Sequence, residues 1–195
     1  MTGTSDLRNE LEGLFPVRGD AASEYLDQLN ALAEQVDEKV LRRPDVSELV
    51  GSCPVEVITT NHRNHARFMA TVFALDLPSL LVRVIPWAYR VYTIRGVSYE
   101  YFEAELSAWM DAAEEHLGAA RAEPICRIYR WMLDHHEDMK QLSREVRPFT
   151  PSEGDWSDEL DALLSCLLDG DADGARRMAE ESAPDATTVQ NRVLS

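Results

Sequence analysis

Residues 61–117 hold three apolar-faced helical segments in close succession, and this pattern constrains the fold more than any other feature of the chain. In the first segment, His65 shares an i, i+3, i+7, i+10 spacing with Phe68, Val72 and Leu75. That spacing is typical of one face of an amphipathic helix. We therefore expect His65 to point into a helical core, and we expect the whole chain to adopt an all-α fold.

The second and third segments extend the same pattern. Pro86 should kink the second helix, because proline removes one backbone donor from the helix. Gly96 should end that helix and Ser98 should cap the next one. The predicted buried faces are Leu80, Val84, Trp87, Val91 and Ile94 in the second segment, and Tyr99, Phe102, Leu106, Trp109 and Ala113 in the third.

The rest of the chain divides by composition. Residues 1–19 are polar with three glycines and a proline, and we expect a flexible lead-in there. Residues 20–147 form the helical domain, which begins with one helix over 20–42. The β-branched piece 52–60 has no partner strand and predicts a loop or a short helix. Residues 148–156 contain two prolines and a glycine and predict a linker.

A long helix is expected from Pro124 to Arg147, since proline is tolerated at the first helical position. Its apolar face places His135 toward the core and His136 elsewhere. His65 and His135 are thus two inward histidines on separate helices. Each is explained equally well as a core histidine that is hydrogen-bonded to its surroundings.

Charge and cysteine usage exclude several classes of function. The net charge of −16 and the pI near 4.6 argue against nucleic acid or an anionic membrane as a partner, because both need a basic surface. Three widely spaced cysteines fit reduced thiols in a cytosol. The polar N-terminus shows no signal peptide and no apolar run is long enough to cross a bilayer, so we expect a soluble, cytoplasmic protein.

Motifs for catalysis are missing. The chain has no nucleophile elbow, phosphate loop or zinc spacing. His62 and His65 lie one helical turn apart, but no acid or cysteine in helical register completes a metal shell. We therefore expect neither an enzyme nor a metal site.

The parts for a tetrapyrrole pocket are present in the central segments. A flat conjugated ligand needs aromatic walls and a few cations for its propionates. The candidate lining residues are His65, Trp87, Tyr92 and His135, and the candidate propionate partners are Arg67, Arg83 and Arg90. Taken singly, the aromatic residues also fit core fillers and the arginines also fit surface cations on an acidic protein.

Residues 157–195 resemble the opening of the helical cap that precedes a cobalamin-binding domain. The match consists of the leucine-rich start at Leu163-Leu164, the turn at Gly170-Asp171, the helix Ala175 to Ala179, and the hydrophobic segment Val189 to Leu194. The tryptophan and Glu-His motif of the cap are missing, as is the domain that follows it. No cobalamin-contacting residue is therefore carried over, and cobalamin binding would require that further domain.

A helical domain ahead of such a cap resembles the photocobilins, bacterial photoreceptors that combine a B12 domain with a biliverdin-binding domain. The resemblance implies that residues 20–147 are a globin-like, biliverdin-binding domain with a role in light signalling, followed by a partial helical-bundle cap, and that the protein forms a homo-oligomer. Two alternatives remain. One is a ligand-free helical interaction module that dimerises through 158–195, and the other is a haem-binding globin-type sensor with an axial histidine.

Overall fold

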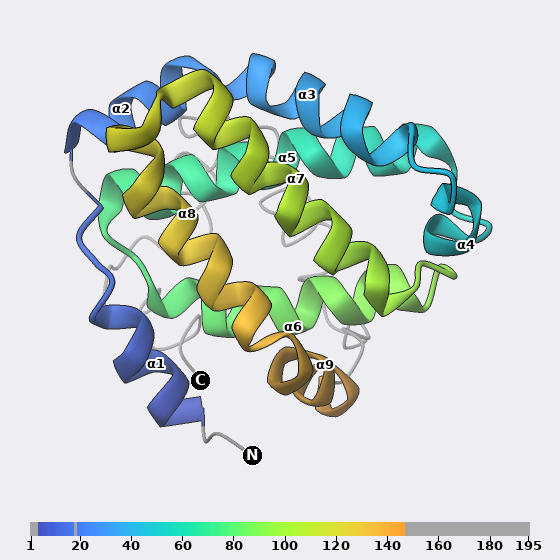
Figure 1. Ribbon diagram of the computed structural model, residues 1–195. Helices are drawn as coiled ribbons and strands as arrows, with labels where there is room; N and C mark the ends of the chain where they lie inside the picture. The colour runs from blue at the N-terminus through green and yellow to red at the C-terminus, as the bar shows by residue number, and fades with distance from the viewer. Residues whose placement is uncertain (1–3, 18, 147–195) are drawn as a thin grey trace, which may run out of the picture. The chain divides into compact units, whose positions relative to one another are not determined.

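The computed structural model describes residues 4–17 and 19–146, which form helices joined by short turns and contain no strand (Figure 1). The prediction of an all-α fold is confirmed. These helices belong to one compact unit that spans residues 1–148. The predicted linker at 148–156 and the predicted partial cap at 157–195 lie outside the described residues.

The helices differ widely in length, from a single turn to more than five turns. In chain order they are α1 (Thr4–Glu12), α2 (Gly19–Asp27), α3 (Leu29–Leu41), α4 (Val46–Val50), α5 (Val55–Leu75), α6 (Ser79–Thr93), α7 (Tyr99–Leu117), α8 (Ala119–Asp134) and α9 (His136–Glu145).

Helix α7 is at the centre of the packing. It lies along α8, to which it is joined at Gly118, and it also packs against α3. Helix α3 packs in turn against α5, whereas α6 packs against α9 and α1. Figure 1 shows α7 and α8 running obliquely across α5 and α6.

The N-terminal stretch is a packed helix and not the flexible lead-in that its composition predicts. Leu7 and Leu11 lie one turn apart on α1, and both side chains are fully buried in the core. Only two apolar positions mark this helix, so its periodicity is too short to detect in the sequence.

Three helix boundaries also differ from the prediction. The single helix expected over 20–42 is interrupted at Gln28, which separates α2 from α3. Helix α5 begins at Val55, inside the stretch that was expected to be a loop or a short helix. Helix α8 begins at Ala119 and ends at Asp134, so the long helix expected from 124 to 147 is two helices.

The predicted buried face of α6 is wrong. The side chains that α6 buries are Leu81, Val82, Pro86 and Tyr89, whereas Trp87 is 43% exposed and Ile94 is 57% exposed. Apolar residues occupy nearly the full circumference of this helix, so two neighbouring stripes fit the helical period equally well. Packing against α9 and α1 decides which stripe is buried.

Two glycines bring the turn after α4 against the turn after α6. Gly51 has φ +56°, and a Cβ atom there would overlap the carbonyl oxygen of Gly96. Next to this contact, the amide of Ser98 donates to the carbonyl of Leu49 at 2.8 Å. The close approach holds the start of α7 in place.

The burial of α1 can be tested by shortening Leu11. We expect Leu11→Ala to lower the free energy of unfolding by about 2–4 kcal/mol, because it leaves a cavity in the core. Urea denaturation followed by circular dichroism would measure the loss. The matched control Leu26→Ala, at a position that is 52% exposed, should cost less than about 1 kcal/mol. Equal effects of the two substitutions would contradict a packed α1.

Candidate ligand pocket and its polar wall

A narrow pocket lies between α5 and α6, two helices whose backbones do not pack closely against each other. Its volume is about 70 Å³, and α7 and α8 complete its wall. Most of the lining residues are aliphatic or aromatic. The complete lining is Asn61, His65, Phe68, Met69, Leu81, Val84, Ile85, Ala88, Tyr89, Tyr92, Phe102, Glu105, Leu106 and Met132. On one side Tyr89 and Phe102 stack with ring centroids 3.9 Å apart.

Two larger hollows are shallow and charged. One, of about 490 Å³, lies between α3 and the end of α7 and is lined by residues that include Glu34, Glu38 and Arg42. The other, of about 530 Å³, is lined by residues from the end of α7 and the start of α8. Ligand sites for apolar molecules are enclosed and mainly hydrophobic, so we take the smaller pocket as the candidate site.

The pocket contains two of the sequence-predicted lining residues, His65 and Tyr92. Trp87 does not belong to its wall, because its side chain lies on the exposed stripe of α6. Burial raises the pKa of the Tyr92 hydroxyl, and the nearby Glu105 raises it further.

His135 lies outside the pocket, and of the two neighbouring histidines it is His136, predicted to point elsewhere, that is the more deeply buried. His135 stands at the break between α8 and α9 with non-helical backbone angles, and its Nε2 is 3.2 Å from a carboxylate oxygen of Glu10. His136 is the buried one, and its Nδ1 is 2.9 Å from the Tyr89 hydroxyl. The break between α8 and α9 rotates the residues that follow it, so His135 and His136 do not point in the directions that one unbroken helix would give them.

The three candidate arginines face away from the pocket. Arg67 and Arg83 are exposed. Arg90 is partly buried, and its Nε has no hydrogen-bond partner among the described residues. It follows the pocket residue Ala88 by two positions, about 200° around the helix, so it lies on the opposite side of α6.

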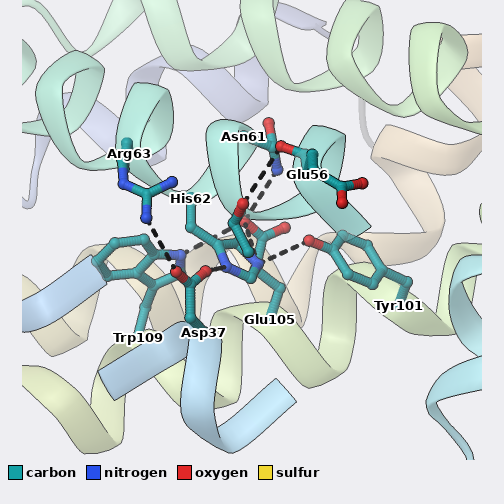
Figure 2. A network of polar contacts seen from close by, with 9 residues as sticks. Asp37, Glu56, Asn61, His62, Arg63, Tyr101, Glu105 and Trp109 are labelled. Atoms are coloured by element: carbon teal, nitrogen blue, oxygen red, sulfur yellow. Dashed lines mark hydrogen bonds and ion pairs between the residues drawn. The ribbon is translucent and has the colours of Figure 1, made fainter. Parts of the chain in front are cut away.

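A buried histidine next to the pocket organises a polar network that the sequence did not reveal (Figure 2). His62 is fully buried. Its Nδ1 is 2.5 Å from a carboxylate oxygen of Asp37 on α3, and its Nε2 is 2.8 Å from the hydroxyl of Tyr101 on α7. With both nitrogens engaged, His62 is not available as a metal ligand beside His65.

His65 belongs to a second chain of polar groups. Its Nε2 lies 3.2 Å from the hydroxyl of Tyr129, which in turn lies 2.8 Å from the hydroxyl of Tyr25. The imidazole also stacks on Trp109, with centroids 5.0 Å apart. Burial, aided by the neighbouring His62, lowers the pKa of His65 to about 3. His65 is therefore neutral at physiological pH.

Glu105 is the remaining polar group of the pocket wall, and it is only 3% exposed. Its Oε1 accepts from Asn61 Nδ2 at 3.2 Å and from Trp109 Nε1 at 3.5 Å. Burial raises the pKa of this carboxyl, and the nearby His62 partly offsets the effect. The sequence did contain a signal for Glu105, because it lies on the apolar seam of α7, four residues after Tyr101 and four before Trp109.

Over 4–17 and 19–146, no group of three or more histidine, cysteine or acidic side chains is placed to hold a metal ion. Over the same ranges, no helix combines the length and the apolar character needed to cross a membrane.

Comparison with known proteins found no matching family model, no matching curated protein and no matching solved structure. The arrangement can enclose an apolar ring, offer one buried carboxyl to it, and exclude bulk water. In this wall the neutral His65 stacks on Trp109 and Tyr129 and lies 3.2 Å from the hydroxyl of Tyr129.

The neutral state of His65 predicts a specific dependence of stability on pH. In the unfolded chain an ordinary histidine takes up a proton near pH 6.5, whereas folded His65 does so near pH 3. The unfolded state therefore binds more protons between these values, and stability is lost as pH falls from 6.5 toward 3. Replacement by asparagine should remove this contribution, which is at most about 1.4 kcal/mol per pH unit.

Urea midpoints from pH 7 to pH 4.5 would measure the contribution of His65 to the pH dependence of stability. The wild type should lose more stability over this range than His65→Asn does. Tyr129→Phe is the matched control, because it removes the hydrogen bond but keeps the imidazole. That variant should be less stable at every pH and should retain the wild-type slope. Parallel wild-type and His65→Asn profiles would show that His65 does not titrate as described.

Proposed function

We propose that the helical unit is a sensory domain that binds a linear tetrapyrrole such as biliverdin without catalysing a reaction, as the resemblance to photocobilins implies. The observation that supports this proposal is the enclosed apolar pocket between α5 and α6, with His65, Tyr92 and Glu105 in its wall. Flat conjugated ligands are bound in pockets of this composition, with a small number of polar groups setting their orientation.

The pocket must widen to admit such a ligand. Its volume of about 70 Å³ accommodates little more than one small ring, whereas pockets for ligands of this size measure about 300–1,000 Å³. We expect the wall formed by α6 to move, because α6 does not pack closely against α5. We expect the ligand to enter between α5 and α6 and to displace α6.

Displacement of α6 would be transmitted toward the C-terminal end of the described chain. The pocket residue Tyr89 is hydrogen-bonded through its hydroxyl to His136, at the start of α9, and α6 packs along α9. A change in the ligand that moves Tyr89 would therefore alter the position of α9. This contact provides a route from a photochemical event to neighbouring parts of the protein.

Filling the pocket mouth tests the location of the site. We expect Ala88→Trp to weaken biliverdin binding at least about tenfold, because the indole would occupy the space between α5 and α6. Absorption titrations with biliverdin would measure this, and a bound pigment should show a sharpened, red-shifted band that changes on illumination. Ala120→Trp, at an exposed position on α8, is the matched control and should bind as the wild type does.

Parallel titrations with haemin separate the proposal from the haem-sensor alternative. A Soret band without a bilin signal would move the assignment to a haem sensor, for which His65 is the histidine in the pocket wall. Unchanged spectra of free pigment in both titrations would contradict tetrapyrrole binding altogether.

An interaction module is the second candidate, and the exposed apolar stripe of α6 favours it. Trp87 and Ile94 are largely exposed, and Val91 between them is partly exposed. If this stripe joins two copies, Trp87→Ser combined with Ile94→Ser should convert the homo-oligomer to a monomer in light scattering. Truncation after Pro148 tests the other interface that the sequence suggests, at 158–195. An unchanged number of chains in the oligomer in both cases would contradict the interaction module.

A further inference from the structure

Glu105 is the only buried carboxyl among the described residues, and it lies in the wall of the pocket. A carboxyl that is removed from water is costly unless hydrogen bonds or an opposite charge compensate for the loss of solvation. The partners of Glu105 therefore indicate which kind of group the pocket is prepared to receive.

The contacts of Glu105 converge on one of its two oxygens. Asn61 and Trp109 donate to Oε1, and the His62 Nε2 that lies 3.9 Å from the same oxygen is already engaged with Tyr101. Among the described residues, no lysine or arginine forms an ion pair with Glu105. The carboxyl is thus held in position by the neutral donors Asn61 and Trp109, and no lysine or arginine side chain of the described residues pairs with it.

Titratable groups from several neighbouring helices face Glu105. Burial lowers the pKa of His65 to about 3 and raises the pKa values of the facing tyrosines. His62 and Asp37, which contact each other, do not line the pocket. The groups are Tyr25 on α2, His62 and His65 on α5, Tyr89 and Tyr92 on α6, Tyr101 on α7 and Tyr129 on α8.

We infer that Glu105 recognises the N–H edge of a nitrogen heterocycle, and that the ligand enters the pocket with this edge first and its carboxylates left at the surface. For the tetrapyrrole of the proposed function, on which this inference rests, the N–H groups are those of the pyrrole rings. A carboxylate stabilises a donor, and a protonated donor most of all. A ligand carboxylate that entered instead would face the carboxyl of Glu105, and the arginines that could bind it lie on the outer surfaces of α5 and α6.

The acid–base titration of the bound pigment tests this recognition. An opposite charge within about 4–6 Å favours the protonated form of a nitrogen base by roughly one to three pH units. Biliverdin bound to the wild type should therefore keep its protonated, long-wavelength band to a higher pH than free biliverdin does. In Glu105→Gln the transition should move down by at least about one pH unit.

Glutamine is a suitable replacement because it retains an oxygen that can accept from Asn61 and Trp109. Glu103→Gln, on an exposed turn of the same helix, is the matched control and should titrate as the wild type. If Glu105→Gln fails to fold by circular dichroism, the wild type compared with free pigment decides the question. Identical titrations of wild type and folded Glu105→Gln, or of bound and free pigment, would overturn the inference.

The orientation of the ligand is tested with biliverdin dimethyl ester, in which the propionates carry no charge. If the carboxylates remain at the surface, the ester should bind within about threefold of biliverdin. A loss of binding greater than about thirtyfold would show that the propionates are recognised inside and would overturn the proposed orientation. Failure of the wild type to bind biliverdin at all would instead contradict the proposed function, so the two failures are distinguishable.

Discussion

The buried carboxyl of Glu105 needs hydrogen-bond donors, and this need constrains how α5 faces α7. An unsatisfied buried polar group costs about 1–3 kcal/mol. Asn61 on α5 and Trp109 on α7 supply the donors, and His62, next to Asn61, is held by Asp37 on α3 and Tyr101 on α7. A shift of α5 along α7 would break several of these bonds together. Helix α3 packs against both helices and supports the same alignment.

The size of the side chains between these helices explains why a pocket exists. Aromatic rings and imidazoles fill the centre: Trp109 and His65 stack on each other, and Tyr129 stacks with both. Rings of this size keep the surrounding backbones apart, and rigid rings do not fill the resulting space as completely as aliphatic chains do. The gap that remains is at the border between α5 and α6, where neither helix has the other as its main packing partner. Ligand entry there would separate few existing contacts.

Much of the helical architecture was predictable from apolar periodicity, because long amphipathic helices such as α5 and α7 repeat their pattern over several turns. The predicted burial of Phe102, Leu106, Trp109 and Ala113 on α7 is confirmed. Periodicity failed in helices where the apolar residues were too few, or too evenly spread around the helix, to mark one buried face. Helix α1 has only two buried leucines, and α6 is apolar around most of its surface, so the burial of one stripe and the exposure of Trp87 follow from tertiary packing.

The candidate site was less predictable than the fold, since a site depends on where several helices meet. His65 and Tyr92 were identified from their own helices, and both line the pocket between α5 and α6, whose wall α7 and α8 complete. His135 was misplaced by a single non-helical residue: each position on a helix turns the side chain by about 100°, so the break at His135 gave the buried place to His136. Glu105 shows the opposite case. An acid within an apolar seam is a local signal, and its burial cost requires donors from a second helix, so such a residue indicates a structured polar site before any of its partners are known.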